Sequence, residues 1–337
     1  MSADRPQTSR QRFLIIQTAF TGDAILSTAV VEKLAAALPG SSVDVLVRKG
    51  NDGLFEGHPH IRRLYVWDKS RGNKYRTLWP LMKQLRANHY DVCMKLQRHT
   101  TTALIALNCA ARETVGFSGS MLSRFFTRQF PRRMNASAGL THEVDQYLRL
   151  LTGIVPDVSR VLPRLYPSPK DFKRVKTEGP YVTVAPASVW FTKQYPAEKW
   201  GKVIDRINPA TTVRLIGAGA DRDMCERVRA CTNHPKVENC AGMFTLLQSA
   251  ALMKGAVMNY VNDSAPLHLA TAMGAPVTAV FCSTVPAFGF GPLGPNGRVV
   301  ESEEKLSCRP CGIHGRRRCP RGHFKCAEIP AQRIATS

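Results

Sequence analysis

Short apolar runs alternate with amphipathic stretches along the first half of the chain. Strand-like runs lie at 13–16, 43–47, 64–67 and 92–96, and helical periodicity covers 23–38, 75–89 and 142–151. Short continuous apolar runs between helical segments are typical of strands buried in a parallel sheet. The first half of the chain therefore predicts a domain of alternating strands and helices.

A proline-rich stretch interrupts this pattern. Five prolines fall within residues 156–180, which have no helical or strand period and therefore resemble a linker. The alternation then restarts, with strands expected at 181–185, 213–216, near 237, at 256–261 and from 277, and helices from 196, from 221, over 245–253 and from 264. Two such blocks predict an α/β fold with two parallel-sheet domains.

We place the boundaries from these patterns. We expect an N-terminal domain over residues 1–165, a Pro-rich linker over 166–180, a C-terminal domain over 181–305 and a Cys/Arg-rich segment over 306–337. In open parallel sheets, ligands bind at the carboxyl ends of the strands. The natural active site is therefore a cleft between the two domains.

The charge balance of the chain is strongly basic. Its 337 residues include 47 Lys and Arg against 25 Asp and Glu, a net charge of +22. Residues 51–150 hold 16 basic and 7 acidic residues, and residues 306–326 hold six basic residues and no acid. Such an excess favours an anionic partner, which is a nucleic acid, an anionic membrane face or a phosphorylated substrate.

The apolar runs also bear on location. No stretch approaches 18 consecutive apolar residues, so we expect no transmembrane helix. The start is polar through Arg12, and the apolar run at 13–16 is too short for a signal peptide. We therefore expect a cytoplasmic protein whose ten cysteines are mostly reduced thiols.

The turn after the first expected strand carries Gly22 and Asp23. A carboxylate at or near a helix start either caps the helix, which is worth about 1 kcal/mol, or accepts a proton from an acceptor hydroxyl at the mouth of a site. The helix N-terminus favours the ionised carboxylate and so weakens it as a base. The second role of Asp23 therefore needs closure and desolvation of the site.

Two segments of the second block follow expected strands. Residues 262–268 run from a buried strand into a helix, whose first N–H groups are either merely capped or bind a pyrophosphate. Residues 185–196 carry Ser188, Thr192 and Lys193. These three side chains either belong to an ordinary loop or bind and neutralise phosphates.

Residues 217–223 contain two weaker signals. Gly217 and Gly219 match the first two glycines of a dinucleotide-binding fingerprint, but Arg222 stands at the third place. Asp221 and Asp223 form an Asp-x-Asp pair, a spacing that also holds a metal on a nucleotide. At the start of a helix such carboxylates more simply cap the helix and complement its dipole. We expect no catalytic metal there.

Four cysteines cluster near the C-terminus, at Cys308, Cys311, Cys319 and Cys326. Four thiols with one close pair are the raw material of a structural zinc or iron–sulfur site, but the spacings are not those of two symmetric pairs. We expect no required cofactor. The arginines between these cysteines favour nucleic acid, whereas the presence of one aromatic residue, Phe324, leaves no stacking platform.

Taken together, these segments resemble the ADP-heptose:lipopolysaccharide heptosyltransferases, glycosyltransferase family 9. The matching segments cover most of the chain: Gly22-Asp23, His142-Glu143-Val144-Asp145, Pro186-Ala187-Ser188 with Lys193 and Pro196, Asn262-Asp263-Ser264-x-Pro266-x-His268-Leu269-Ala270, Phe290-Gly291-Pro292-Leu293-Gly294-Pro295, and Cys308-Arg309-Pro310-Cys311 with Cys319-Pro320-x-Gly322-His323 and Cys326. The cysteine pattern is similar to that of the heptosyltransferase II branch.

The resemblance implies a GT-B architecture, in which two Rossmann-like domains face each other across a cleft and the second domain holds the donor nucleotide. It implies an inverting, metal-independent transfer of heptose from ADP-heptose to a sugar hydroxyl of the lipopolysaccharide inner core. The implied partners are the nucleotide-sugar donor, a phosphorylated glycolipid acceptor and the anionic cytoplasmic face of the inner membrane, bound peripherally, with no specific nucleic acid. The basic residues at 51–150 lie in the domain that binds the acceptor.

The resemblance also assigns roles to residues. Asp23 matches the general base. The residues matching phosphate positions are Ser188 and Lys193 with the backbone of Ser264, Ala265, Pro266 and Leu267. Asp263 matches the sugar position, Met243 and Leu246 match the adenine position, and Asp221 or Asp223 approaches the ribose. Thr192 and His268 complete the set of expected donor-binding residues.

Two other classes of function remain. One is a GT-B transferase or an epimerase that uses another nucleotide sugar. Its nucleotide preference separates it from a transferase that uses ADP-heptose. The other is a basic protein that binds nucleic acid, for which salt-sensitive binding to DNA or RNA is the expected sign.

Overall fold

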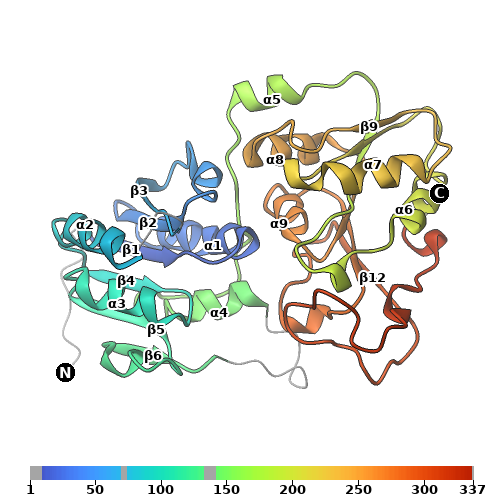
Figure 1. Ribbon diagram of the computed structural model, residues 1–337. Helices are drawn as coiled ribbons and strands as arrows, with labels where there is room; N and C mark the ends of the chain where they lie inside the picture. Colours follow the sequence, from blue (N-terminus) through green and yellow to red (C-terminus); the bar gives the residue numbers. More distant parts are fainter. Residues whose placement is uncertain (1–9, 70–73, 133–141, 336–337) are drawn as a thin grey trace. The chain divides into compact units, whose positions relative to one another are not determined.

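The computed structural model describes residues 10–69, 74–132 and 142–335, which form two compact units (Figure 1). The first unit comprises residues 1–133 and 144–163, and the second comprises residues 134–143 and 164–337. In each unit the described strands form one six-stranded sheet in which every neighbouring pair is parallel. The predicted α/β class with two parallel sheets is confirmed.

The sheet of the first unit has the strand order β3-β2-β1-β4-β5-β6. Its elements are β1 (Arg12–Gln17), α1 (Thr21–Ala37), β2 (Ser42–Arg48), β3 (Ile61–Trp67), α2 (Lys74–Arg86), β4 (Val92–Lys95), α3 (Thr100–Asn108), β5 (Glu113–Phe117), β6 (Arg128–Phe130) and α4 (Glu143–Arg149), with short 3-10 turns at Asp52–Phe55 and Ser123–Phe125. Each strand that sequence patterns predicted is present.

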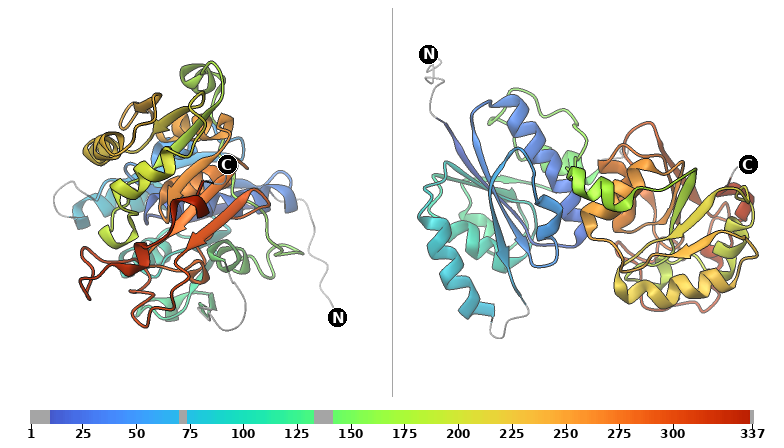
Figure 2. Two further views of the ribbon diagram at one scale, coloured as in Figure 1. Left: turned by 90° about the vertical axis from the view of Figure 1, so that its right-hand side faces the viewer. Right: turned by 90° about the horizontal axis from the view of Figure 1, so that it is seen from above.

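Alternate residues of β1 face opposite sides of this sheet. Leu14 and Ile16 are fully buried and pack with Leu78 of α2 and Ile105 of α3. In the right-hand view of Figure 2, α1 (blue) and α2 (cyan) lie on opposite faces of the sheet. The central strand is therefore covered on both sides, which explains why its sequence is continuously apolar.

The sheet of the second unit has the order β12-β11-β10-β7-β8-β9. Its elements are α5 (Pro169–Val175), β7 (Tyr181–Ala185), α6 (Ala197–Ile204), β8 (Thr212–Leu215), α7 (Arg222–Ala230), β9 (Val237–Asn239), α8 (Leu246–Gly255), β10 (Asn259–Asn262), α9 (Ala265–Ala272), β11 (Val277–Phe281) and β12 (Gly297–Glu301), with 3-10 turns at Phe191–Lys193, Gly219–Asp221, Pro286–Phe288, Lys325–Ala327 and Ala331–Arg333.

The core on one face of this sheet includes the end of the chain. Trp200 of α6 and Val228 of α7 are fully buried there, together with Cys326, Ile329 and Ile334 of the C-terminal segment. Figure 1 draws this segment in red after β12. The Cys/Arg-rich segment therefore contributes apolar side chains to the core of the second unit.

One helix lies where the sequence predicted an unstructured linker. The α5 helix begins after Ser168, whose hydroxyl accepts a hydrogen bond from the Asp171 N–H, while the Asp171 carboxylate accepts one from the Ser168 N–H. This reciprocal capping stabilises a helix too short to show a period of its own. Sequence patterns also missed α3, β5, β6 and β12, which are short or lie among polar residues.

None of the helices in the described ranges is long and apolar enough to cross a membrane. The expectation about a signal peptide rests partly on residues 1–9, which lie outside the described residues.

Candidate functional site

The two central strands of the second sheet, β7 and β10, are neighbours from which the chain continues in opposite directions. Loops that follow such a pair separate above the sheet and leave a crevice, where ligands of open α/β sheets bind. Residues 186–196 follow β7, and Asp263 and Ser264 follow β10. The fold thus brings together two of the segments that the sequence analysis singled out.

Asn262 fixes the shape of the loop after β7. Its carboxamide is fully buried, donates to the Pro186 carbonyl at 2.7 Å and accepts from the Tyr195 N–H at 3.1 Å. Within the loop, the Gln194 amide donates to the Ser188 carbonyl at 2.6 Å. One side chain at the end of β10 therefore holds both ends of the loop that carries Lys193. The sequence analysis did not predict that Asn262 fastens this loop. The feature that indicates the role is an asparagine at the end of a buried strand.

Lys193 and Asp263 form an ion pair at this edge of the sheet. The Lys193 Nζ lies 2.6 Å from the Asp263 Oδ2, and the Thr284 hydroxyl donates to the same oxygen at 2.6 Å. The two side chains are only 14% and 6% exposed. Because charges removed from water need partners, the Asp263 carboxylate holds the Lys193 ammonium in place. The hydroxyl of Thr284 fixes the orientation of the carboxylate.

The first turn of α9 lies directly beside this pair in the sequence. Ser264 is the N-cap residue, but its hydroxyl makes no capping hydrogen bond, and Pro266 occupies the first turn. The N–H groups of Ser264 and Ala265 have no hydrogen-bond partner among the residues described here. Unsatisfied N–H groups and the positive end of a helix dipole favour an anion. Leu267 differs, since its N–H donates to the Ser264 carbonyl.

His268 of α9 is buried and uncharged near neutral pH. Burial, with smaller contributions from the neighbouring His142 and Lys193, lowers its pKa to about 3. Its Nδ1 has no hydrogen-bond partner in the described part of the chain, and its ring stands edge-on to Phe290. The positive charge next to the α9 turn therefore comes from Lys193 and not from His268.

Thr192 has its hydroxyl inside the protein. The Thr192 Oγ1 accepts from the Arg316 N–H at 2.8 Å and from the Ser283 hydroxyl at 2.9 Å, and the side chain is 1% exposed. Ser188, by contrast, is partly exposed. Of these two hydroxyls, that of Thr192 fastens three segments of the second unit together, whereas that of Ser188 remains open to a ligand.

The loops after β8 and β9 approach each other backbone to backbone. Gly242 has a φ of +77°, and a Cβ there would lie 2.8 Å from the Cα of Gly219. Met243 follows at 48% exposure, and Leu246 begins α8 partly buried. The two loops are thus held close together at their glycines, and Met243 and Leu246 are apolar residues with exposed surface that follow this contact.

The two aspartates of the Asp-x-Asp pair differ. The Asp221 carboxylate accepts from the Ala218 N–H at 2.8 Å and so closes its own turn. Asp223 lies exposed in the first turn of α7. Within the described ranges, no group of three or more His, Cys, Asp or Glu side chains is arranged to hold a metal ion.

The four C-terminal cysteines are free thiols in the structure. Cys308 Sγ lies 3.7 Å from the Nε2 of His323, and the Cys311 thiol donates to the Cys308 carbonyl at 3.2 Å. Burial raises the pKa of Cys326 to about 11 and raises that of Cys311 as well. These two thiols are therefore protonated near neutral pH.

In the first unit, Asp23 is the third residue of α1, whose N-cap is Phe20. The Tyr147 hydroxyl donates to the Asp23 Oδ1 at 3.3 Å and accepts from the Gln17 amide at 3.0 Å. The Gln17 carboxamide in turn lies 2.7 Å from that of Gln97, which follows β4. Asp23 therefore stands at the β1/β4 switch point of the first sheet and is oriented by Tyr147, which sequence reasoning missed.

Basic side chains surround this carboxylate. Lys69 donates to the Thr18 carbonyl at 2.9 Å. Burial lowers the pKa of His99, and the charges of Lys69 and Lys95 lower it further, whereas Asp23 acts in the opposite direction. Burial also lowers the pKa of Lys95 to about 8, and its buried Nζ has no hydrogen-bond partner among the described residues. Lys95 is also fully buried, so among these groups Lys69 is the cation open to an anionic ligand.

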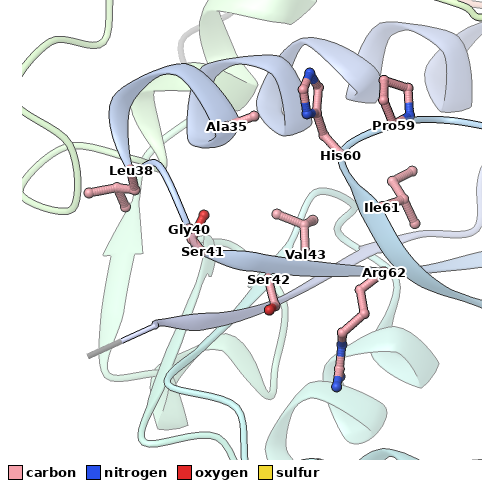
Figure 3. A pocket seen from close by; sticks show the side chains of 10 residues that line it. All are labelled: Ala35, Leu38, Gly40, Ser41, Ser42, Val43, Pro59, His60, Ile61 and Arg62. Carbon is pink, nitrogen blue, oxygen red and sulfur yellow. The ribbon is translucent and has the colours of Figure 1, made fainter. Parts of the chain in front are cut away.

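A separate hollow of about 230 Å³ lies at the opposite edge of the same sheet. Figure 3 shows it at the start of β2 and β3, lined among others by Ser42, His60 and Arg62. Because ligands of parallel sheets bind at the carboxyl edge, this hollow is not the candidate site.

Comparisons with known proteins agree on one family. The model of glycosyltransferase family 9 (heptosyltransferase) matches residues 78–316. The chain is 26% identical to lipopolysaccharide heptosyltransferase 3 of Escherichia coli over 282 residues, which cover 79% of this chain and 82% of the relative. Its fold is similar to that of the E. coli ADP-heptose heptosyltransferase II, with a TM-score of 0.79, 20% identity and 96% of each chain covered. It is also similar to an E. coli heptosyltransferase solved with ADP, with a TM-score of 0.71, 19% identity, and 86% of this chain and 92% of that chain covered.

Proposed function

Because the chain belongs to glycosyltransferase family 9, the heptosyltransferases, we propose that it transfers a heptose from ADP-heptose to a sugar hydroxyl of the phosphorylated lipopolysaccharide inner core, with inversion at the anomeric carbon. One observation carries the proposal: the Lys193–Asp263 ion pair lies beside the uncapped first turn of α9. A cation and free N–H groups at one point suit the diphosphate of a nucleotide sugar.

The diphosphate accepts hydrogen bonds from the N–H groups of Ser264 and Ala265 and from the Lys193 ammonium. Ser188 supplies a further hydroxyl from the facing loop. As the glycosidic bond breaks, negative charge grows on the departing diphosphate, and the fixed cation and helix end stabilise it. Asp263, held by Thr284, positions Lys193 and contacts the heptose. This arrangement supplies the positive field without a metal ion.

The adenosine part lies along the carboxyl edge of β8 and β9. Met243 and Leu246 give its base an apolar surface. Asp223 binds the ribose hydroxyls, because its carboxylate is exposed, whereas that of Asp221 is already engaged by the Ala218 N–H. A small number of polar groups on an apolar ledge is the usual composition of a nucleoside site.

Asp23 acts as the general base in this proposal. It takes the proton of the acceptor hydroxyl while that oxygen bonds to the anomeric carbon on the side opposite the leaving diphosphate, so the product has the inverted configuration. Tyr147 holds the Asp23 carboxylate in one orientation. Lys69, which is exposed at this edge of the sheet, favours an acceptor that carries phosphate or carboxylate groups. An acceptor of this kind is a glycolipid, which places the enzyme peripherally at the cytoplasmic face of the inner membrane.

Nucleotide selectivity tests the donor. We would follow thermal unfolding with ADP, UDP, GDP and CMP at equal concentration, since a ligand at 100 times its dissociation constant adds about 2.7 kcal/mol to the stability of the folded state. We expect selective stabilisation by ADP. Selective stabilisation by UDP would replace the donor with another nucleotide sugar, and conversion of the sugar nucleotide without an acceptor would indicate an epimerase.

A further inference from the structure

Residues 315–322 form a loop, here called the arginine loop, in which Arg316, Arg317, Arg318 and Arg321 are all exposed. With Trp190 the loop lines a hollow of about 900 Å³. No acidic residue occurs between Glu304 and Glu328. In the described part of the chain, none of the four arginines forms an ion pair with a carboxylate. The positive charge of this surface is therefore not neutralised by the protein itself.

The arginine loop is fastened to the loop that carries Lys193. The Thr192 N–H donates to the Arg316 carbonyl at 3.1 Å, and the Arg316 N–H donates to the Thr192 Oγ1 at 2.8 Å. Gly315, with a φ of +77°, packs so closely that a Cβ would lie 3.1 Å from the Lys193 Cγ. The arginines therefore extend from a backbone of fixed position and not from a free tail.

Apolar side chains are exposed on both sides of Trp190. Val189 is 79% exposed and Phe191 is 48% exposed, and Ile313, just before the arginine loop, is 38% exposed. The Phe191 ring stacks at 5.2 Å on Phe324. Exposed aliphatic and aromatic side chains beside arginines have the composition of protein surfaces that lie in a membrane interface.

We propose that the arginine loop, together with Val189, Trp190 and Phe191, docks the second unit on an anionic lipid surface. The headgroup phosphates bind the four arginines, and Val189 and Phe191 reach the boundary of the acyl chains. The inference rests on the proposed function, because an acceptor anchored in a membrane requires the donor site to approach that membrane. It places a lipid contact in the second unit, in addition to the basic residues 51–150.

The composition favours lipid over nucleic acid. Proteins that bind single strands stack successive bases on aromatic platforms along a groove. The most exposed apolar side chain beside the arginine loop is instead the aliphatic Val189. An aliphatic side chain strengthens lipid binding because its apolar surface leaves water. It cannot stack on the bases of a single-stranded nucleic acid. Each arginine near an anionic bilayer is worth roughly a fivefold gain in partitioning.

Co-sedimentation of the full chain with vesicles tests the proposal. We would compare vesicles of phosphatidylglycerol and phosphatidylethanolamine with vesicles of phosphatidylcholine alone, and expect binding to the former that weakens with salt. The double variant R317E/R318E should lose about 25-fold or more in partitioning. Its matched control is K202E/K254E, which makes the same charge change at exposed lysines of α6 and α8. This control should bind the anionic vesicles at least about tenfold more tightly than R317E/R318E. The variant V189S should lose a smaller factor, about three- to tenfold.

Three results would overturn the proposal. The first is equal binding of R317E/R318E and wild type to anionic vesicles, and the second is tighter binding of the wild type to a single-stranded oligonucleotide than to those vesicles. The third is unchanged vesicle binding with a raised KM for a water-soluble acceptor, which would assign the arginines to substrate. Sedimentation needs neither donor nor acceptor, so it is independent of the heptose-transfer test. Equal melting temperatures of the variants exclude misfolding as the cause of a loss.

Discussion

The ammonium of Lys193 and the carboxylate of Asp263 are 2.6 Å apart, although 70 positions separate them in the sequence. Two loops of the second sheet hold them there, one closed by Asn262 and the other oriented by Thr284. Lys193 therefore needs little rearrangement to meet a diphosphate at the α9 turn. Preorganised charge of this kind stabilises a developing anion without a reorganisation cost at the moment of reaction.

The variant Lys193→Ala should weaken ADP binding. Loss of one charge-assisted hydrogen bond costs about 1.5–3 kcal/mol, or roughly a tenfold to 150-fold rise in the dissociation constant measured by calorimetry. The control Lys202→Ala removes an exposed lysine of α6 and should leave the affinity unchanged. Equal affinity of Lys193→Ala and wild type would remove Lys193 from the donor site.

The variant Asp23→Asn should separate binding from transfer. General base catalysis contributes about 10²- to 10⁴-fold, so kcat should fall by this factor while the affinity for ADP stays the same. Tyr147→Phe leaves the Asp23 carboxylate in place but removes the hydroxyl that orients it and that accepts from Gln17, and should give a smaller loss in kcat. Turnover of Asp23→Asn near the wild-type rate would exclude the carboxylate as the base.

Lys95 should cost stability near neutral pH. Burial lowers its pKa from 10.5 to about 8, so the unfolded chain binds more protons than the folded chain between pH 8 and 10.5. Stability therefore rises with pH across this window, and the full cost, up to about 3 kcal/mol, applies below pH 8. Lys95→Met should raise the free energy of unfolding in urea by about 1–3 kcal/mol at pH 7, and by less at pH 10.

The matched control for this change is Lys83→Met, at an exposed position of α2. It should leave the free energy of unfolding within about 0.5 kcal/mol of wild type. A Lys95→Met variant less stable than wild type at pH 7 would show that the buried ammonium has a partner that offsets its desolvation.

His268 should make the second unit sensitive to acid. Its folded pKa of about 3 lies below its ordinary value of 6.5, so the unfolded chain binds more protons between these values. The stability it contributes is complete above pH 6.5 and decreases as the pH falls toward 3. Urea unfolding of His268→Gln should therefore depend less on pH between 6 and about 4 than that of wild type. Identical slopes would mean that His268 is not the group that takes up the proton.

Sequence patterns predicted the two sheets, whereas they did not predict the contacts between distant residues at the candidate site. The apolar run of β1 and the run of β7, which is apolar except for the buried Thr183, reflect burial on both faces, so period and composition were sufficient there. The contacts of Asn262 with Pro186 and of Tyr147 with Asp23 join residues 76 and 124 positions apart. No local pattern encodes such pairs, because they exist only once the strands have adopted their spatial order.

The burial of Thr192 illustrates a different limit. A threonine next to Lys193 in a loop after a strand looks like a phosphate ligand, yet its hydroxyl is taken by Ser283 and by the Arg316 N–H. The segment that supplies Arg316 lies 124 positions further along the chain. The sequence singled out the loop after β7, but the partner of each hydroxyl in it depends on a distant segment.

The attachment of Asn262 to both ends of the loop after β7 also constrains how this protein can change during evolution. Both ends of this loop are hydrogen-bonded to one carboxamide. Residues inserted at its tip therefore lengthen the loop without moving the strands or the α9 turn. Substitutions and insertions at residues 187–191 are therefore expected to leave the position of Lys193 on the sheet unchanged. Replacement of Asn262 weakens that independence, since the contacts of Thr192 with Ser283 and Arg316 would then be left to hold the loop beside Lys193.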